Sequence, residues 1–83
     1  MKLQLRYFAS VREALGRGEE SVESSAATLG ALRDELIARG EPYALALARG
    51  RAVRMALDQV MRNEDAALTD GAEIAFFPPV TGG

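Results

Sequence analysis

The chain has 83 residues, no cysteine and no histidine, and its 10 basic and 12 acidic side chains give a net charge of −2. This length is enough for one small domain with a single core. The composition excludes disulfides, thiolate metal sites and a cysteine nucleophile, and it removes the commonest general base and metal ligand. The balanced charge argues against a nucleic-acid-binding face, which would be basic. We therefore expect no self-contained catalytic centre, no metal site and no bound cofactor.

The distribution of apolar residues predicts a soluble cytoplasmic protein. No apolar stretch approaches the ~20 residues that cross a membrane. The first residues, MKLQLRYF, lack the cationic start and long apolar centre of a signal peptide.

The first part of the chain has the pattern of two strands joined by a short helix. Residues 2–8 alternate between apolar and polar side chains, as in a strand with one buried face. Ser10 and Glu13 have the spacing of a capping box, which predicts a helix from there to about Leu15. Residues 18–23 predict a second strand, so that the segment folds as a hairpin. Its acidic side chains are expected on a solvated edge: Glu19, Glu20 and Glu23.

Residues 28–40, TLGALRDELIARG, predict the main helix. Thr28 is suited to cap its N-terminus, and Gly40 is suited to end it. The helix has one apolar stripe with helical spacing, made of Leu29, Leu32, Leu36 and Ile37. A second short helix is favoured for residues 42–50.

The last part of the chain predicts three more strands. Residues 53–57 alternate in polarity, residues 58–59 suit a tight turn, and residues 60–62 suit a short returning strand. The Thr-Asp-Gly sequence at 69–71 is a strong turn signal. It precedes an alternating strand over residues 72–77.

These elements predict an α+β fold in which a mixed sheet of four to five strands packs on one main helix, with one or two short helices. An amphipathic helix needs one sheet face to cover it. The first and last strands have the most apolar inner faces, so we expect them near the sheet centre. The predicted organisation is a domain over residues 1–77 and an extended tail over residues 78–83.

The segment FFPPVTGG at the end of the sequence is the candidate active part of the chain. Proline lacks a backbone N–H and has a fixed φ, so a proline pair ends the sheet and directs the chain outward. Glycine has no Cβ, so a Gly-Gly tip fits a slot that admits only backbone. The tail thus has a stiff base, a spacer and a thin tip: Pro78-Pro79, Val80-Thr81 and Gly82-Gly83.

The reactive group of this tail is the α-carboxylate of Gly83. A carboxylate is a poor electrophile until it is activated, usually as a mixed anhydride with a nucleotide phosphate. The other glycines are scattered and form no phosphate-binding motif. A separate enzyme must therefore activate the tail.

Two phenylalanines predict a docking surface beside the base of the tail. If the alternate residues of the first and last strands fill the core, Phe8 and Phe77 point away from it. They are neighbours only if the two strands run parallel. Met61, at a strand edge, is suited to join them. The alternative is that the connector at residues 9–16 covers both phenylalanines.

The whole chain resembles the small, sulfur-carrying subunits of molybdopterin synthases, which are ubiquitin-like β-grasp proteins. The most specific segment combines a D-G turn, an alternating strand, F-F-P-P and a terminal G-G. Residues 42–55 contribute little. The resemblance rests on RYFASVREALG, TLGALRDEL, ALDQV and LTDGAEIAFFPPVTGG.

This resemblance implies that an adenylyltransferase related to ubiquitin-activating enzymes uses ATP to adenylate Gly83, which then becomes a thiocarboxylate. The tail would enter a pocket of the large subunit, where its sulfur attacks a cyclic pyranopterin precursor to build the dithiolene. The catalytic residues would belong to the large subunit, in an assembly of two small and two large subunits. The implied partner-binding residues are Phe8, Met61, Phe77, Pro78, Pro79, Val80 and Thr81.

Three other functions remain open. The chain could be the sulfur carrier for thiamine thiazole synthesis, although those carriers are generally shorter and lack the F-F-P-P run. It could be a ubiquitin-like modifier joined through Gly83 to lysines of other proteins. It could also be a plain interaction module with an inert tail.

Overall fold

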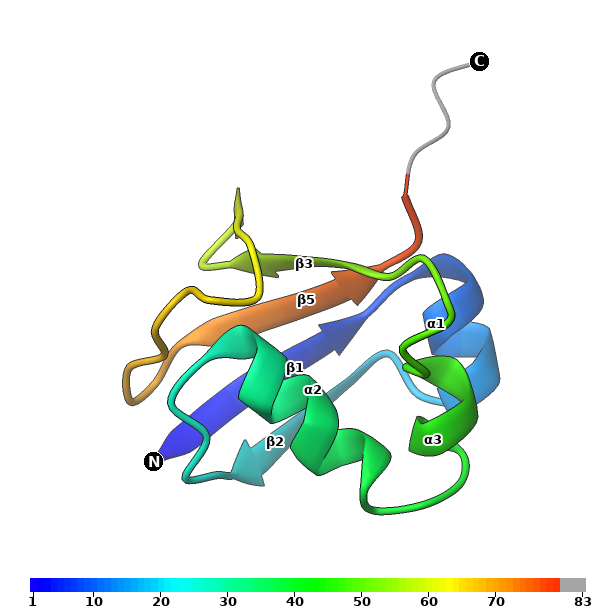
Figure 1. The fold of residues 1–83 in the computed structure, drawn as a ribbon, viewed down its shortest axis with the longest axis horizontal. Helices are drawn as coiled ribbons and strands as arrows, with labels where there is room; N and C mark the ends of the chain where they lie inside the picture. The colour runs from blue at the N-terminus through cyan, green and yellow to red at the C-terminus, as the bar shows by residue number, and fades with distance from the viewer. Residues whose placement is uncertain (80–83) are drawn as a thin grey trace.

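The structure, a computed structural model, describes residues 1–79. Its sheet has five strands in the order β2-β1-β5-β3-β4, and the main helix lies across one face of it (Figure 1). The elements in chain order are β1 (Lys2–Tyr7), α1 (Ala9–Leu15), β2 (Glu19–Glu23), α2 (Leu29–Ile37), α3 (Tyr43–Ala46), β3 (Arg54–Leu57), β4 (Val60–Met61) and β5 (Glu73–Phe77).

The first and last strands lie side by side in the interior of the sheet. β1 and β5 are parallel and place Tyr7 opposite Phe76, whereas β1 is antiparallel to β2 and β5 is antiparallel to β3. The predicted mixed sheet, the N-terminal hairpin and the interior position of both strands are therefore confirmed. Because parallel strands end at the same edge of a sheet, Phe8 and Phe77 come to one edge.

The core lies between the sheet and α2. Alternate residues of β1 and β5 meet the apolar stripe of the helix, as their spacing predicts. The rings of Tyr7 and Phe76 stack with their centroids 5.9 Å apart. Burying each large apolar side chain contributes about 2 kcal/mol. The largest side chains in this core are Leu3, Leu5, Tyr7, Leu29, Leu32, Leu36, Leu47, Ile74 and Phe76.

The main helix begins where the sequence predicts and ends earlier. The hydroxyl of Thr28 accepts a hydrogen bond from the Ala31 amide (3.2 Å), which confirms the N-cap. The helix stops at Ile37 rather than near residue 40. Gly40 then adopts a φ of +87°, a left-handed conformation that suits glycine and turns the chain toward α3.

The capping box predicted at Ser10 and Glu13 is wrong. Phe8 is the N-cap residue of α1, and no side chain caps the helix. The Phe8 amide still donates to the Phe76 carbonyl (3.1 Å), so the β1–β5 pairing extends to the residue before the helix. Ser10 is therefore already inside the first turn. The helix ends at Leu15, as predicted, and Gly16 follows it with a φ of +76°.

Candidate functional site

Figure 1 shows that β1 and β5 end side by side. Of the predicted partner-binding residues, Phe8 follows β1, Phe77 ends β5, Pro78 and Pro79 follow it, and Met61 lies on β4. Phe8 is 45% exposed, and Met61 is 61% exposed. Phe77 is half-buried and follows the fully buried Phe76. The parallel pairing that the phenylalanine hypothesis required is present, and the connector that includes α1 leaves Phe8 accessible.

Small side chains fill the space between these large ones. Ala75 on β5 pairs in register with Ala56 on β3, and Ala56 pairs with Met61 on β4. Directly paired residues point to the same face of a sheet. We call the resulting region the apolar patch, which consists of Phe8, Met61, Ala75 and Phe77 together with the buried Ala56 beneath them.

The base of the tail rests beside α1 and the segment before β3. Pro78 and Pro79 are half-buried. Pro78 borders a hollow of about 160 Å³ that is also lined by Val11 of α1 and by residues 51–53. The predicted tail residues Val80, Thr81, Gly82 and Gly83 lie outside the described residues.

The described part of the chain carries the exposed apolar patch and no grouped metal ligands. Within residues 1–79, no three acidic side chains are grouped as they would be to hold a metal ion. The helices of this part are all too short or too polar to cross a membrane.

Glu20 is predicted from the sequence to be solvated, but in the structure it is a largely buried hydrogen-bond acceptor. It shares one face of β2 with Val22, and that face points toward the helices, so only 11% of its side chain is exposed. Its Oε1 accepts hydrogen bonds from the hydroxyls of Tyr7 (2.8 Å) and Tyr43 (2.7 Å). The prediction that Glu20 lies on a solvated edge is wrong. Because side chains of a strand alternate between its two faces, the apolar Val22 could have indicated that Glu20 points to the same, buried face. Exposure is confirmed for the other two, Glu19 and Glu23.

The groups around Glu20 favour its ionised form. Burial alone would raise the pKa of this carboxyl, but hydrogen bonds from Tyr43 and Tyr7 and the charge of Arg17 together lower it. Burial first, and then the hydrogen bond to Glu20, raise the pKa of both tyrosines. The carboxylate thus joins β1, β2 and α3 next to the sheet edge that carries Phe8.

Replacing Glu20 by glutamine should lower the free energy of unfolding by about 1.5 kcal/mol at pH 7, since an amide is a weaker acceptor than a carboxylate. The folded-state pKa is lowered, so this contribution is complete above the unfolded pKa of about 4.3 and disappears as pH falls through the folded value. Urea unfolding at a series of pH values should therefore show the two proteins converging in acid.

Glu19→Gln is the matched control for this prediction, because Glu19 neighbours Glu20 but is exposed, and its carboxylate forms a loose ion pair with Arg6 (3.8 Å). Its stability should follow that of the unmodified chain within about 0.5 kcal/mol. Equal losses in the two variants would show that the buried hydrogen bonds of Glu20 do not contribute.

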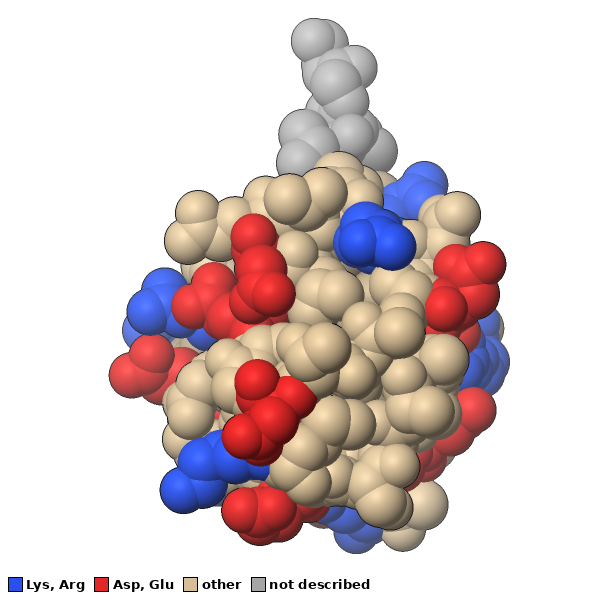
Figure 2. Space-filling model, turned by 90° about the vertical axis from the view of Figure 1, so that its left-hand side faces the viewer, with Lys and Arg blue, Asp and Glu red and all other residues tan. Residues whose placement is uncertain are grey.

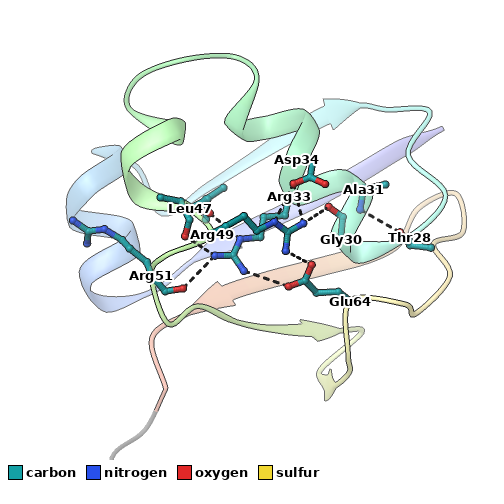
Figure 3. Close-up of polar contacts among 10 residues, drawn as sticks. Thr28, Gly30, Ala31, Arg33, Asp34, Leu47, Arg49, Arg51 and Glu64 are labelled. Carbon is teal, nitrogen blue, oxygen red and sulfur yellow. Dashed lines mark hydrogen bonds and ion pairs between the residues drawn. The ribbon is translucent and has the colours of Figure 1, made fainter.

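Arg33 is a second residue that the sequence-based reading missed, and it is only 3% exposed. Figure 3 shows it pointing from α2 into the loop after α3. Its Nε donates to the Leu47 carbonyl (2.8 Å), and one terminal nitrogen donates to the carbonyls of Ala48 (2.7 Å) and Arg51 (3.3 Å). The other terminal nitrogen pairs with Glu64 (3.4 Å). One buried guanidinium therefore holds three backbone carbonyls.

Arg49 extends this network at the surface. Its guanidinium donates to Asp34 (2.8 Å) and to the Gly30 carbonyl (3.1 Å), and it pairs with Glu64 (Figure 3). The Gly30 amide donates to the Glu64 carbonyl (2.9 Å). A Cβ at position 30 would lie 3.1 Å from the Glu64 Cβ, so glycine permits this close approach.

This network explains why the second helix is shorter than predicted. α3 covers only Tyr43–Ala46, whereas the sequence favours a helix over residues 42–50. The carbonyls of residues 47, 48 and 51 turn toward Arg33 instead of continuing a helical ladder. The same segment continues into residues 51–53, which border the hollow beside Pro78. Arg33 thus positions the loop segment that lies beside Pro78, at the base of the tail.

Comparisons with known proteins agree with this geometry. Residues 5–83 match the sequence model of the ThiS family. The chain is 42% identical to the molybdopterin synthase sulfur carrier subunit of Escherichia coli, over 98% of this chain and 99% of that one. It superimposes on a putative molybdopterin converting factor, subunit 1, from Pyrococcus furiosus with a TM-score of 0.78 at 27% identity, over 96% and 99% of the two chains.

A further solved structure shows a similar chain in an assembly. It is the protein–protein complex of subunits 1 and 2 of the molybdopterin-converting factor from Helicobacter pylori. The matched chain has a TM-score of 0.67 and 25% identity, and the whole of both chains is covered.

The five-stranded mixed sheet around one main helix, with the patch at the edge where the tail leaves, defines a ubiquitin-like β-grasp protein. The family match covers nearly the whole sequence, so the chain belongs to the ThiS family. The predicted fold and the resemblance to molybdopterin synthase small subunits are both confirmed. The roles of Phe8, Met61, Phe77 and the tail residues stay predictions.

Proposed function

We propose that this chain is the sulfur carrier subunit of a molybdopterin synthase. The observation that carries the proposal is the 42% identity to the Escherichia coli sulfur carrier subunit over 98% of the chain. The family match supports it because it extends through residue 83 and so includes the tail. The chain itself is a non-catalytic donor, and the reaction is completed by residues of its partners.

In this proposal, the carboxylate of Gly83 is first adenylated with ATP by an adenylyltransferase related to ubiquitin-activating enzymes. A sulfur donor then displaces AMP and leaves a thiocarboxylate on Gly83. The thiocarboxylate sulfur attacks a cyclic pyranopterin precursor, and two such transfers form the dithiolene of molybdopterin. Gly82 and Gly83 have no Cβ, so together they form a tip thin enough for a narrow partner site.

The apolar patch is the proposed docking surface for the large subunit. Its aromatic and methionine side chains are of the kind that contribute most at protein interfaces. Pro78 and Pro79 direct the chain away from β5, and Val80 and Thr81 supply the length that reaches the partner's pocket. The complex of subunits 1 and 2 from Helicobacter pylori supports this arrangement, since a chain of the same fold associates there with a second subunit.

Intact mass spectrometry tests the proposal. Incubation with the activating enzyme of the same genome, ATP and a sulfur donor should replace one oxygen of the chain by sulfur, and fragmentation should place the change on Gly83. Omission of ATP is the control and should prevent the change. A chain that stays unmodified under complete conditions, or that is recovered mainly in isopeptide linkage to lysines, would contradict sulfur carriage.

A further inference from the structure

Two arginines border the apolar patch on its β3–β4 side. Arg54, the first residue of β3, pairs in register with Phe77, so its side chain points to the same face beside that ring. Arg62 follows β4 and shares a hollow of about 200 Å³ with Arg54 and Met61. Both arginines are exposed. The patch therefore has a cationic border at the side where the tail leaves.

This positive charge is not neutralised by the described part of the chain. Among residues 1–79, no carboxylate lies within ion-pair distance of Arg54 or Arg62. Arg6, on the β1 side of the patch, differs because Glu19 and Glu73 both pair with it. The cationic groups that form ion pairs are the Met1 amino group, Arg6, Arg17, Arg33 and Arg49. Among the described residues, Lys2, Arg12, Arg39 and Arg51 also lack an ion pair, so Arg54 and Arg62 are distinguished by their place beside the patch.

This border is positive although the chain as a whole has a net charge of −2. Figure 2 shows the side of the molecule that carries the N-terminus and the loop before β5, where acidic and basic side chains alternate around an uncharged area. Arg54 and Arg62 thus place positive charge without an ion-pair partner among residues 1–79 directly next to the patch.

A partner that covers Phe77 must also cover part of Arg54, since directly paired residues of neighbouring strands have Cβ atoms only about 5 Å apart. Removing a guanidinium from water without a counter-charge costs several kcal/mol. An uncharged or cationic partner surface would therefore lose much of what the aromatic contact contributes. A carboxylate placed over each arginine removes this cost and accelerates encounter.

We infer that the surface that docks on the apolar patch is a protein surface whose apolar centre is bordered by carboxylates that pair with Arg54 and Arg62. The inference rests on the proposed function, under which this partner is the large subunit of the synthase. It adds a determinant of partner choice, because a partner with basic residues at these positions is rejected.

Association kinetics with the large subunit encoded in the same genome test this inference. Arg54→Glu should lower the association rate constant about 10-fold, and the Arg54→Glu/Arg62→Glu double variant should lower it further. Raising the salt concentration from about 50 to about 500 mM should slow the unmodified chain more than the double variant. Thermal unfolding of each variant shows whether it is folded.

Two further variants make the outcome decisive. Lys2→Glu changes the charge equally but lies six residues along β1 from Phe8, about 20 Å away, so its association rate should be unchanged. Phe77→Ala reports docking on the patch and should mainly raise the dissociation rate. Normal rates for the arginine variants together with a weakened Phe77→Ala would overturn the charge inference and leave the docking proposal intact.

Two other results would also be decisive. If Phe77→Ala bound as tightly as the unmodified chain, the patch would not be the docking surface. Both the docking proposal and the charge inference would then be overturned. If Lys2→Glu slowed association as much as Arg54→Glu, the effect would come from net charge, and the proposed pairing would be overturned.

Discussion

Deletion of Gly83 is expected to lower sulfur transfer to the pterin precursor at least about 100-fold, with the melting temperature within about 2 °C of that of the full chain. The deletion shortens the tail by about 3.3 Å. A displacement of about 1 Å at a reacting centre can already cost a factor of 100. The contacts described for residues 1–79 are all retained, which is why stability should be preserved.

Transfer is measured with the purified large subunit, the activating enzyme and the precursor, and stability is measured by thermal unfolding. A chain with one alanine added after Gly83 moves the carboxylate in the opposite direction and should be equally inactive. Glu19→Gln, which changes an exposed side chain of β2, is the active control. Transfer above a tenth of the normal rate in both length variants would contradict the assignment of Gly83 as the carrier.

Replacement of Arg33 by alanine is expected to lower the free energy of unfolding by about 3 kcal/mol, the largest stability effect that we predict. The change removes the donor to the carbonyls of residues 47, 48 and 51 and the partner of Glu64. Removing one partner of a buried ion pair typically costs about 3–5 kcal/mol. Loss of the aliphatic part of the Arg33 side chain also leaves a cavity. Urea unfolding at neutral pH measures the loss.

Arg39→Ala is the matched control, since Arg39 follows the same helix but is exposed, with its guanidinium over the Tyr43 ring at 5.6 Å from the centroid. Its loss should not exceed about 1 kcal/mol. Hydrogen exchange of the amides in residues 47–51 should accelerate in Arg33→Ala alone. Similar losses in the two variants, or unchanged exchange in this loop, would contradict the positioning role of Arg33.

The sheet and the main helix could be predicted because their patterns are local. β1 and β5 each bury one face, so alternation of polarity alone identifies them. The apolar stripe of α2 and the Thr28 cap likewise lie within a few residues of each other. The phenylalanine pair followed from the same alternation once parallel pairing was considered.

The polar networks could not be predicted because their partners are distant in sequence. Arg33 stands four residues after Leu29 and three before Leu36, which places it near the apolar stripe. The acceptors that permit its burial come from a loop 14 to 18 residues away and from Glu64. Glu20 similarly depends on Tyr43, which lies 23 residues away.

The candidate site was only partly visible in the sequence for a related reason. Phe8, Met61 and Phe77 stand out as apolar residues at strand ends. Arg54 gains its place beside Phe77 only through the register of β3 on β5, which no local pattern specifies.

The parallel pairing of β1 with β5 also has a consequence during synthesis. Translation makes β1 first and β5 last, and until residues 73–77 have left the ribosome β1 and β3 have no strand between them. A nascent or truncated chain therefore presents Phe8 without Phe77. The proposed docking surface is completed only when β5 is in place, so we expect chains that lack β5 to bind the partner weakly.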